Sequence, residues 1–227
     1  IIQDEFKKIG YNLTLQVLSS ADYGVPQIRQ RVFFIGLRED LPFDKNKLIP
    51  KIDFSKKNYL KLWDAISDLP QINSGQGEAN QKYLLKPKNN YQKLMRKNSK
   101  QVFNHVATPH DEMAIKRIKL IKQGQNFRDL PKNLQTKSVH SGAWGRLEAN
   151  GLAPTITTRF DTPSVGRVIH PYQDRTLTVR EAARIQSFPD DFVFYGNRTS
   201  QGIQVGNSVP PLVGKAIGKM FIKQFLN

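Results

Sequence analysis

Regular apolar patterning is concentrated near the two ends of this chain, and a basic segment lies between them. Near the start, residues 12–18 alternate polar and apolar side chains, and residues 31–37 are rich in β-branched and aromatic residues, which is typical of strands. Near the end, residues 210–226 carry an apolar stripe at helical spacing. The pattern therefore predicts a strand pair and a terminal helix, with a long segment between them.

The middle segment, residues 81–137, holds most of the positive charge. It contains 14 Lys or Arg residues and three acids, so it contributes +11 of the formal charge of +16. Such an excess favours a polyanionic partner, and nucleic acid is the first expectation. Within the segment, residues 111–123 have acids in the first turn and isoleucines near helical spacing, which predicts a helix. Its basic face fits solvent exposure and phosphate contact equally well.

Two further helices are predicted outside the basic segment. Residues 60–69 form a short amphipathic pattern that a proline ends, and Trp63 is expected to pack into the core. Residues 178–187 begin with a capping box formed by Thr178 and Glu181.

The chain contains no cysteine, which excludes disulfides, thiolate metal sites and a cysteine nucleophile within this polypeptide. No apolar run approaches the roughly 20 residues that span a bilayer, and the first residues lack a signal-peptide pattern. We therefore expect a cytoplasmic, DNA-associated protein with no membrane partner. The four histidines lack metal-ligand spacing, so no metal site is predicted: His105, His110, His140 and His170.

Gln27, Arg29 and Arg31 alternate as the chain enters the second predicted strand. Alternation places the three side chains on one face. An amide and two forked guanidinium groups on one edge suit phosphate and carbonyl oxygens. Surface arginines at a solvated strand end are the simpler explanation of the same pattern.

Two later segments carry polar groups suited to ligands. Residues 206–211, Gly-Asn-Ser-Val-Pro-Pro, stand at the head of the last predicted helix, where free backbone N–H groups suit a polar or anionic ligand. Simple N-capping by Asn207 or Ser208 explains the same residues. Residues 151–159 and 175–184 offer hydroxyls and guanidinium groups to a DNA backbone, and a structural role fits them equally well.

Taken in this order, the segments resemble the C-terminal part of bacterial DNA cytosine-5 methyltransferases. The matching motifs are Gln-x-Arg-x-Arg before a strand, Arg-x-Leu-Thr-x-Arg-Glu-x-Ala-Arg, and Gly-Asn-Ser-Val. The resemblance is close over residues 10–38 and 140–218. The residues between these two ranges match the family only by their position in the chain and by their basic character. It implies an α/β fold: the C-terminal part of a Rossmann-like methyltransferase sheet with an inserted, irregular DNA target-recognition domain.

The resemblance also implies a domain division and a chemistry. Residues 1–48 are expected to end the catalytic domain, residues 49–187 to form the target-recognition domain, and residues 188–227 to return to the catalytic domain. In such enzymes the target cytosine is flipped from the duplex, a cysteine thiolate attacks C6, and the methyl group of S-adenosylmethionine passes to C5.

Individual roles carry over from the matching positions. Arg31 matches the arginine that approaches O2 of the flipped base. Arg29 matches a second arginine that lies nearer the phosphate backbone, and Gln27 belongs to the same catalytic motif. Asn207 and Ser208 match positions that approach the cofactor.

The resemblance places DNA contacts later in the chain. Thr155 matches a backbone-contacting threonine, and Thr157 and Arg159 continue that segment. Independently of the resemblance, residues 141–146 form a flexible, glycine-containing pattern just before the Thr155 segment. We expect this loop to bring Trp144 and Arg146 into the major groove, where Arg146 would favour O6 and N7 of guanine; packing of Trp144 within the domain is the alternative. A further set is expected chiefly to organise the recognition domain: Arg175, Arg180, Glu181 and Arg184.

Three parts of the family pattern are missing from these 227 residues: the Phe-x-Gly-x-Gly cofactor loop, the Pro-Cys nucleophile segment and the Glu-Asn-Val segment. We therefore expect a split-enzyme subunit or a C-terminal piece that is inactive alone. Its partners would be double-stranded DNA and a catalytic N-terminal half or separate catalytic subunit, in a restriction-modification system. A non-enzymatic DNA-binding protein derived from a recognition domain is the alternative, and the basic insertion of about 100 residues disfavours an RNA methyltransferase.

Overall fold

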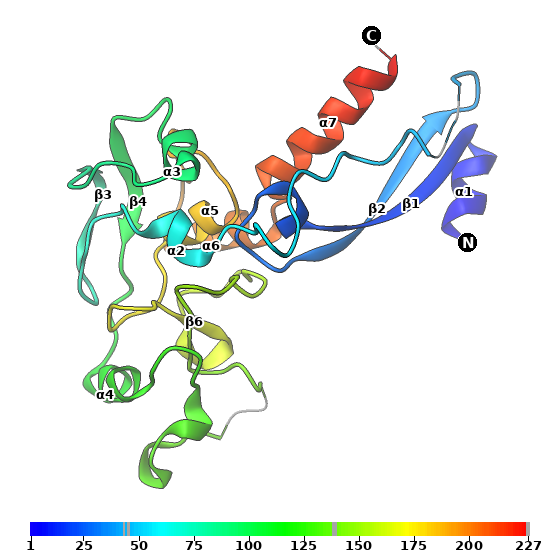
Figure 1. Ribbon diagram of the computed structural model, residues 1–227. Helices are drawn as coiled ribbons and strands as arrows, with labels where there is room; N and C mark the ends of the chain where they lie inside the picture. The colour runs from blue at the N-terminus through cyan, green and yellow to red at the C-terminus, as the bar shows by residue number, and fades with distance from the viewer. Residues whose placement is uncertain (43, 45, 138–139, 226–227) are drawn as a thin grey trace.

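An antiparallel hairpin forms the first part of the computed structural model, which describes residues 1–42, 44, 46–137 and 140–225 (Figure 1). Strands β1 (Tyr11–Ser19) and β2 (Gln30–Arg38) pair in register, with Leu18 opposite Arg31. Both predicted strands are confirmed. The connection contains the 3-10 turn η1 (Ser20–Tyr23) and Gly24, whose φ of 77° suits a residue without Cβ.

The C-terminal helix α7 (Pro211–Phe225) covers one face of the hairpin, as Figure 1 shows. Val213 of α7 packs in a cluster with Leu18, and Met220 packs in a second cluster with Ile35 and Leu37. The predicted helix is confirmed over its described residues. A short helix that the sequence analysis did not predict, α1 (Ile2–Lys8), lies at the far end of β1.

The main core lies away from the hairpin and joins four helices to a second small sheet. Its helices are α2 (Leu62–Ile66), α3 (Asn90–Met95), α5 (Val179–Ile185) and α6 (Arg198–Asn207), and its strands are β3 (Gly77–Lys82) and β4 (Gln101–Val106). The predicted capping box of α5 is confirmed, because Glu181 N–H donates to Thr178 Oγ1 and Thr178 N–H donates to the Glu181 carboxylate. Trp63 is partly buried against this core.

Buried ion pairs hold α5 in place. Arg175 donates to both carboxylate oxygens of Glu181, at 2.8 and 2.6 Å, and Arg184 donates to both oxygens of Asp190, at 2.5 and 2.6 Å. Arg184 also reaches Asp68, at 3.1 Å, beyond the end of α2. These bidentate pairs satisfy charges that would otherwise be costly to bury. Arg184 thereby joins α5 to the end of α2 and to the segment that follows α5.

A smaller unit contains α4 (Glu112–Leu120), β5 (Gly145–Arg146) and β6 (Arg167–Ile169), packed around a cluster that includes Ile118 and Trp144. Helix α4 ends three residues earlier than predicted. The reason is tertiary: Arg146 donates to Ile118 O at 2.7 Å and to Ile121 O at 2.6 Å, so these carbonyls have partners outside the helix.

Other differences from the predicted elements have local causes. Helix α2 is shorter than residues 60–69. Ser67 N–H still donates to Trp63 O, four residues back, whereas Leu69 N–H donates to Ile66 O, three residues back, so the chain leaves the helix in a tight turn before the proline. Helix α6 was missed because its sequence is polar and contains two glycines, and β3 was missed because it lacks apolar alternation. The predicted α/β class is confirmed, with three two-stranded sheets in the described residues. No helix there is long and apolar enough to cross a membrane.

Candidate functional site

Segments that lie far apart in the chain meet at the start of β2. Ala153 N–H donates to Pro26 O at 3.0 Å, and Ile28 N–H donates to Ala153 O at 2.8 Å. The Thr155 hydroxyl donates to Ile28 O at 2.9 Å. The 153–155 segment therefore runs beside the Gln-x-Arg-x-Arg motif, and the bridge between Gln27 and Ala153 is parallel.

Gln27 and Arg29 hold the next residue of that segment, Ile156. Ile156 N–H donates to Gln27 Oε1 at 2.8 Å, and Arg29 Nη1 donates to Ile156 O at 3.0 Å. Gln27 is 0% exposed and Arg29 7% exposed. The sequence predicted that both would lie with Arg31 on an edge open to ligands, whereas the structure buries them, because their polar groups satisfy the backbone of Ile156.

Arg29 also reaches the C-terminal motif. Its Nη2 donates to Gly206 O at 3.0 Å and to Ser208 O at 3.3 Å, which are the carbonyls on either side of Asn207. Burial, and then the charge of Arg31, lowers the pKa of Arg29. One guanidinium therefore joins the hairpin, the Ile156 segment and the end of α6, and it is not directed toward an external phosphate.

Gln186 adds a second buried link between these segments. Its Nε2 donates to Val205 O at 2.5 Å, and its Oε1 accepts from Gln27 Nε2 at 3.4 Å. Gln186 is fully buried at the end of α5. The sequence analysis missed this residue; the only available signal was a polar side chain directly after the apolar Ile185.

Arg31 differs in its surroundings from Arg29, which lies two residues earlier, directly before β2. Arg31 is exposed, and within the described residues its guanidinium donates only to Gln30 O, at 2.7 Å. Its cross-strand neighbour Leu18 is buried. The base of the side chain is therefore fixed by the hairpin, while most of its N–H donors have no partner within the described residues.

Asn207 and Ser208 lie at the end of α6. Asn207 is the last residue of that helix and is exposed, whereas Ser208 is half-buried and donates its hydroxyl to Val205 O at 2.7 Å. Gly206 packs tightly below them: a Cβ there would lie 2.5 Å from Thr158 N. The close approach fixes the position of Asn207 relative to residues 157–158.

The first N–H groups of α7 already have partners. Leu212 N–H donates to Ser187 Oγ at 3.1 Å, and the N–H groups of Val213 and Gly214 donate to Pro210 O. The sequence left two explanations open at this helix start: free N–H groups that suit a polar or anionic ligand, and N-capping by Asn207 or Ser208. The free donors are not observed for Leu212, Val213 and Gly214, and the side chain that accepts from Leu212 N–H belongs to Ser187.

The predicted DNA-contacting segment is exposed on alternate residues. Thr157 and Arg159 are exposed and Thr155 is half-buried, while Ile156 and Phe160 between and beyond them are buried. Arg159 donates to the Thr162 hydroxyl at 3.1 Å. Alternation therefore gives this extended segment one face toward solvent and one face toward the core.

The structure buries Trp144 and Arg146 within the unit formed by α4, β5 and β6 and does not place them in an open loop. Trp144 is 6% exposed in an apolar cluster, beneath the Arg117 guanidinium at 5.3 Å. Arg146 is 5% exposed and donates to five oxygens at 2.6–3.0 Å. These oxygens belong to Ile118, Ile121, His170, Gln173 and Asp174.

This placement corrects the expected groove contact of Arg146. A guanidinium has five N–H donors, and the internal bonds engage it fully. Reaching a guanine would require those bonds to break and leave buried carbonyls without partners, which is costly. The alternative for Trp144, packing within the domain, is the one observed.

The histidines serve as hydrogen-bonding residues where their contacts are described. His105 Nδ1 lies 2.9 Å from Thr178 Oγ1, and its Nε2 lies 2.8 Å from Pro70 O. His170 Nδ1 accepts from the backbone N–H groups of Tyr172 and Gln173. Burial lowers the pKa of His170 to about 3, so this ring is a neutral acceptor at pH 7.

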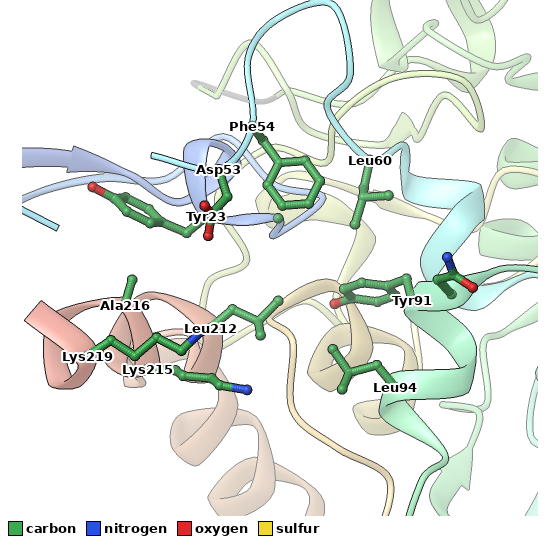
Figure 2. Close-up of a pocket in the computed structure, with 12 residues that line it drawn as sticks. Tyr23, Asp53, Phe54, Leu60, Tyr91, Leu94, Leu212, Lys215, Ala216 and Lys219 are labelled. Carbon is green, nitrogen blue, oxygen red and sulfur yellow. The ribbon is translucent and has the colours of Figure 1, made fainter. Parts of the chain in front are cut away.

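A separate cavity of about 430 Å³ lies between α7, η1 and α3, and Figure 2 shows the residues that line it. Its walls are mainly apolar, including Phe54, Tyr91 and Leu212, and Lys215 and Lys219 of α7 lie along one side. None of the predicted catalytic, cofactor or DNA-contacting residues lines it. The cavity is therefore distinct from the region where the sequence motifs meet.

Comparison with known families supports the motif assignment. The family model described as C-5 cytosine-specific DNA methylase matches residues 1–223. The chain is 38% identical to the type II methyltransferase M.DdeI of Desulfomicrobium norvegicum, covering 100% of this chain and 58% of that protein. It is 32% identical to the type II methyltransferase M1.HphI of Haemophilus parahaemolyticus, covering 100% of this chain and 52% of that protein. The chain thus spans about half the length of these relatives.

Solved structures show the same fold. A DNA modification methyltransferase encoded within an E. coli prophage superimposes with a TM-score of 0.73 at 25% identity, covering 97% of this chain and 62% of that chain. The S. pombe Dnmt2 methyltransferase has a TM-score of 0.54 at 12% identity. In both, the matched region is about three fifths of the solved chain.

Proposed function

Because this chain belongs to the C-5 cytosine-specific DNA methylase family, we propose that it is the target-recognition and late-motif part of a DNA cytosine-5 methyltransferase. The assembled enzyme transfers a methyl group to C5 of a flipped cytosine within a specific duplex sequence. The type II methyltransferases among its relatives favour a role in a restriction-modification system.

The observation that carries this proposal is the bridge made by Arg29. Arg29 binds the carbonyls on both sides of Asn207, and Arg31 follows two residues later, within β2. The segment proposed to face the cofactor and the arginine proposed to face the base are therefore held in one rigid unit. Rigid placement of reacting groups is what a methyl transfer between two bound molecules requires.

Arg31 is proposed to donate hydrogen bonds to O2 of the flipped cytosine. A guanidinium at O2 withdraws electron density from the ring and stabilises the charge that develops when a nucleophile attacks C6. Its exposed guanidinium on a fixed backbone suits that task. Arg29 and Gln27 act indirectly in this proposal, as positioning residues that place Arg31 relative to the segment of Ile156.

Asn207 and Ser208 are proposed to contact S-adenosylmethionine, which supplies the methyl group when bound. The Asn207 amide is exposed, and no described residue hydrogen-bonds it. The Ser208 hydroxyl donates to Val205 O and keeps lone pairs that accept hydrogen bonds. These polar groups fit the amino-acid and ribose portions of such a cofactor, and the rest of its site would come from elsewhere in the enzyme.

The nucleophile must come from sequence outside this chain, since the 227 residues contain no cysteine. We propose that a catalytic half supplies the thiolate and most of the cofactor site, and that this chain alone transfers no methyl group. Duplex DNA is the proposed substrate, attracted by the charge of residues 81–137 and contacted by Thr155, Thr157 and Arg159.

Methyl incorporation tests the proposal directly. The chain is mixed with duplex DNA and tritiated S-adenosylmethionine, alone and together with the part of the Desulfomicrobium methyltransferase that it does not match. Incorporation is expected only in the combined reaction. Incorporation by the purified chain alone contradicts the proposed division of labour, and specific DNA binding without transfer in any combination identifies a non-enzymatic DNA-binding protein.

A further inference from the structure

Two cavities adjoin each other along helix α7, away from the region where the sequence motifs meet. The first, of about 430 Å³, lies between α7, η1 and α3. The second, of about 780 Å³, lies between α7 and the segment that follows β2. Asp53, Ala216 and Lys219 line both cavities, so the two form one groove, which we name the α7 groove.

The half of the α7 groove nearer α3 is apolar and has aromatic walls. Phe54 and Leu212 lie on opposite sides of it, and Tyr91 lies at one end, as Figure 2 shows. Phe54 is held in place from below: its backbone N–H donates to Asp22 O at 3.1 Å, and its ring lies 2.7 Å from the position of a Cβ on Gly24. A larger residue than glycine would therefore displace this wall.

The other two walls are anchored to the C-terminal end of α5. The Tyr91 hydroxyl donates to Arg184 O at 2.5 Å, and Leu212 N–H donates to Ser187 Oγ at 3.1 Å. Each wall of the apolar half is thus fixed by a hydrogen bond to a different part of the chain than its own element. Preformed apolar cavities of this size are typical of small-molecule sites.

The other half of the α7 groove is basic. Lys219 and Lys223 line it from α7, and Lys47 and Lys51 line it from the segment that follows β2. Lys215 extends the series into the apolar half. The three lysines of α7 recur every four residues, so they follow one face of the helix over about 12 Å.

Little negative charge balances these lysines. Among the described residues that line the groove, Asp53 is the one acid, and it pairs with Lys51 at 3.6 Å. The other four lysines form no ion pair within the described part of the chain. Like charges four residues apart destabilise a helix, and a bound polyanion would relieve that repulsion.

We propose that the α7 groove binds a nucleoside triphosphate, with its base in the apolar half between Phe54 and Tyr91 and its phosphate groups along the lysines of α7. Every base has a π face that stacks on aromatic side chains. Lysine ammonium groups bind phosphate oxygens as point charges, and the Asn90 amide in the apolar half offers both a donor and an acceptor to the base or the sugar.

A free nucleotide explains the groove better than duplex DNA does. A duplex keeps its bases stacked inside and presents phosphates alone, which would leave the apolar half without a role. None of the residues proposed to contact DNA or the cofactor lines the groove. The inference concerns this chain's own residues and does not depend on the proposed methyltransferase function.

Isothermal titration calorimetry of the chain with ATP, adenosine and inorganic triphosphate in magnesium-free buffer tests the two halves separately. ATP should bind roughly ten-fold or more tightly than either fragment, because each fragment fills one half of the groove. Adenosine that binds as tightly as ATP removes the role of the lysines, and inorganic triphosphate that binds as tightly removes the role of the apolar half. Either result overturns the inference, as does absence of ATP binding.

Variants locate the contribution of each half. Lys219→Glu should weaken ATP binding roughly ten-fold or more. Lys7→Glu is the matched control, because Lys7 is exposed on α1 outside the groove and the change in net charge is the same. Phe54→Leu keeps an apolar side chain and should weaken ATP binding about five-fold or more while leaving inorganic triphosphate unaffected. Equal losses in Lys219→Glu and Lys7→Glu show attraction by net charge alone and overturn the inference.

Photo-crosslinking with 8-azido-ATP, read by peptide mass spectrometry, places the base directly. Label is expected in the peptides that contain Phe54 or Tyr91, and label at Asn207 instead assigns the nucleotide to the proposed cofactor surface and overturns the inference. Duplex titrations give the remaining alternative: a Lys219→Glu chain that loses DNA affinity ten-fold and keeps its ATP affinity assigns the groove to DNA.

The same calorimetry in the presence of the unmatched part of the Desulfomicrobium methyltransferase examines the groove in the assembled protein. ATP binding should persist in that mixture. Loss of ATP binding there shows that the other polypeptide covers the groove, and it overturns the inference. Methyl transfer measured in parallel reports on the proposed function alone, so failure of one proposal leaves the other standing.

Discussion

Arg29 Nη2 donates to Gly206 O at 3.0 Å, although 177 residues separate the two in sequence. The bond joins the Gln-x-Arg-x-Arg motif to the Gly-Asn-Ser-Val motif, and the same guanidinium binds Ile156 O. An arginine expected to face DNA thus acts as an internal connector. Its position between the proposed base-facing and cofactor-facing residues leads to the first prediction.

Arg29→Ala should lower the free energy of unfolding by about 3 kcal/mol, because it leaves three carbonyl groups in a buried region without their donor. Arg29→Lys should recover less than half of that loss, since a single ammonium group cannot reach all three carbonyl oxygens that the guanidinium binds. Urea denaturation measures both variants. Arg31→Ala is the matched control and should change stability by no more than about 0.5 kcal/mol. Equal effects of the two alanine variants would contradict the stabilising role of the three Arg29 hydrogen bonds.

Arg31→Ala should lower the single-turnover methyl-transfer rate of the assembled enzyme by roughly 100-fold, as expected for loss of one preorganised donor. Duplex affinity should change much less, because general phosphate attraction comes from many other basic residues. Arg31→Lys should restore little, since a point charge does not reproduce the planar fork. A tenfold loss of DNA affinity with an intact transfer rate would make Arg31 a phosphate clamp.

Arg146→Ala should destabilise the chain by about 3 kcal/mol, because it breaks a fully engaged buried guanidinium network. Arg159→Ala, at an exposed position, should leave stability within about 0.5 kcal/mol and reduce the salt slope of duplex binding by about 0.9. Thermal unfolding and DNA titrations of the two variants distinguish the roles. If Arg146→Ala unfolds at the same temperature as the unmodified chain and loses its preference for particular bases, Arg146 contacts the DNA groove after all.

Duplex DNA binding by the isolated chain should be weak and steeply dependent on salt. Each phosphate neutralised contributes about −0.9 to the slope of log K against log salt concentration. Lys116 and Lys119 are exposed on α4, so alanine at both positions should reduce the slope by about 1.8 if the helix contacts phosphates. Fluorescence anisotropy at several salt concentrations gives the slopes, and an affinity independent of salt would reject the electrostatic interpretation.

Acidification should destabilise the fold through His170. Its pKa is about 3 in the folded chain because of burial, against about 6.5 when unfolded. Below pH 6.5 the unfolded state therefore binds a proton that the folded state does not. Stability should fall between pH 6.5 and pH 3, by at most about 1.4 kcal/mol per pH unit for this group.

His170→Asn keeps an acceptor for the Tyr172 and Gln173 N–H groups and removes the titrating ring, so it should flatten this slope. Denaturant unfolding at pH 7, 6 and 5 provides the comparison. Part of the slope should remain, since burial also lowers the pKa of His105. Glu181 faces His170 and is paired with Arg175. Burial raises the pKa of Glu181, but the Arg175 guanidinium has the larger combined effect and holds that pKa well below its usual value. The Glu181 carboxylate therefore stays charged between pH 6.5 and pH 3. An identical slope in His170→Asn would show that other groups cause the acid sensitivity.

The sequence by itself determined the elements whose signals are local. The alternation in residues 12–18 and 31–37 predicts the hairpin, the spacing of Thr178 and Glu181 predicts the start of α5, and the apolar stripe predicts α7. These patterns act over one turn or one strand, so neighbouring residues contain all the information. The order of the motifs was equally sufficient to indicate the family.

Only the tertiary structure decided which arginines face solvent. Arg29 and Arg146 are buried, whereas Arg31 and Arg159 are exposed, and nothing in their immediate sequence separates the two groups. The carbonyls that hold Arg29 and Arg146 come from residues between 24 and 179 positions away. A charged side chain can be buried only where hydrogen-bond acceptors surround it. Here distant segments provide those acceptors, and they come together only when the chain has folded.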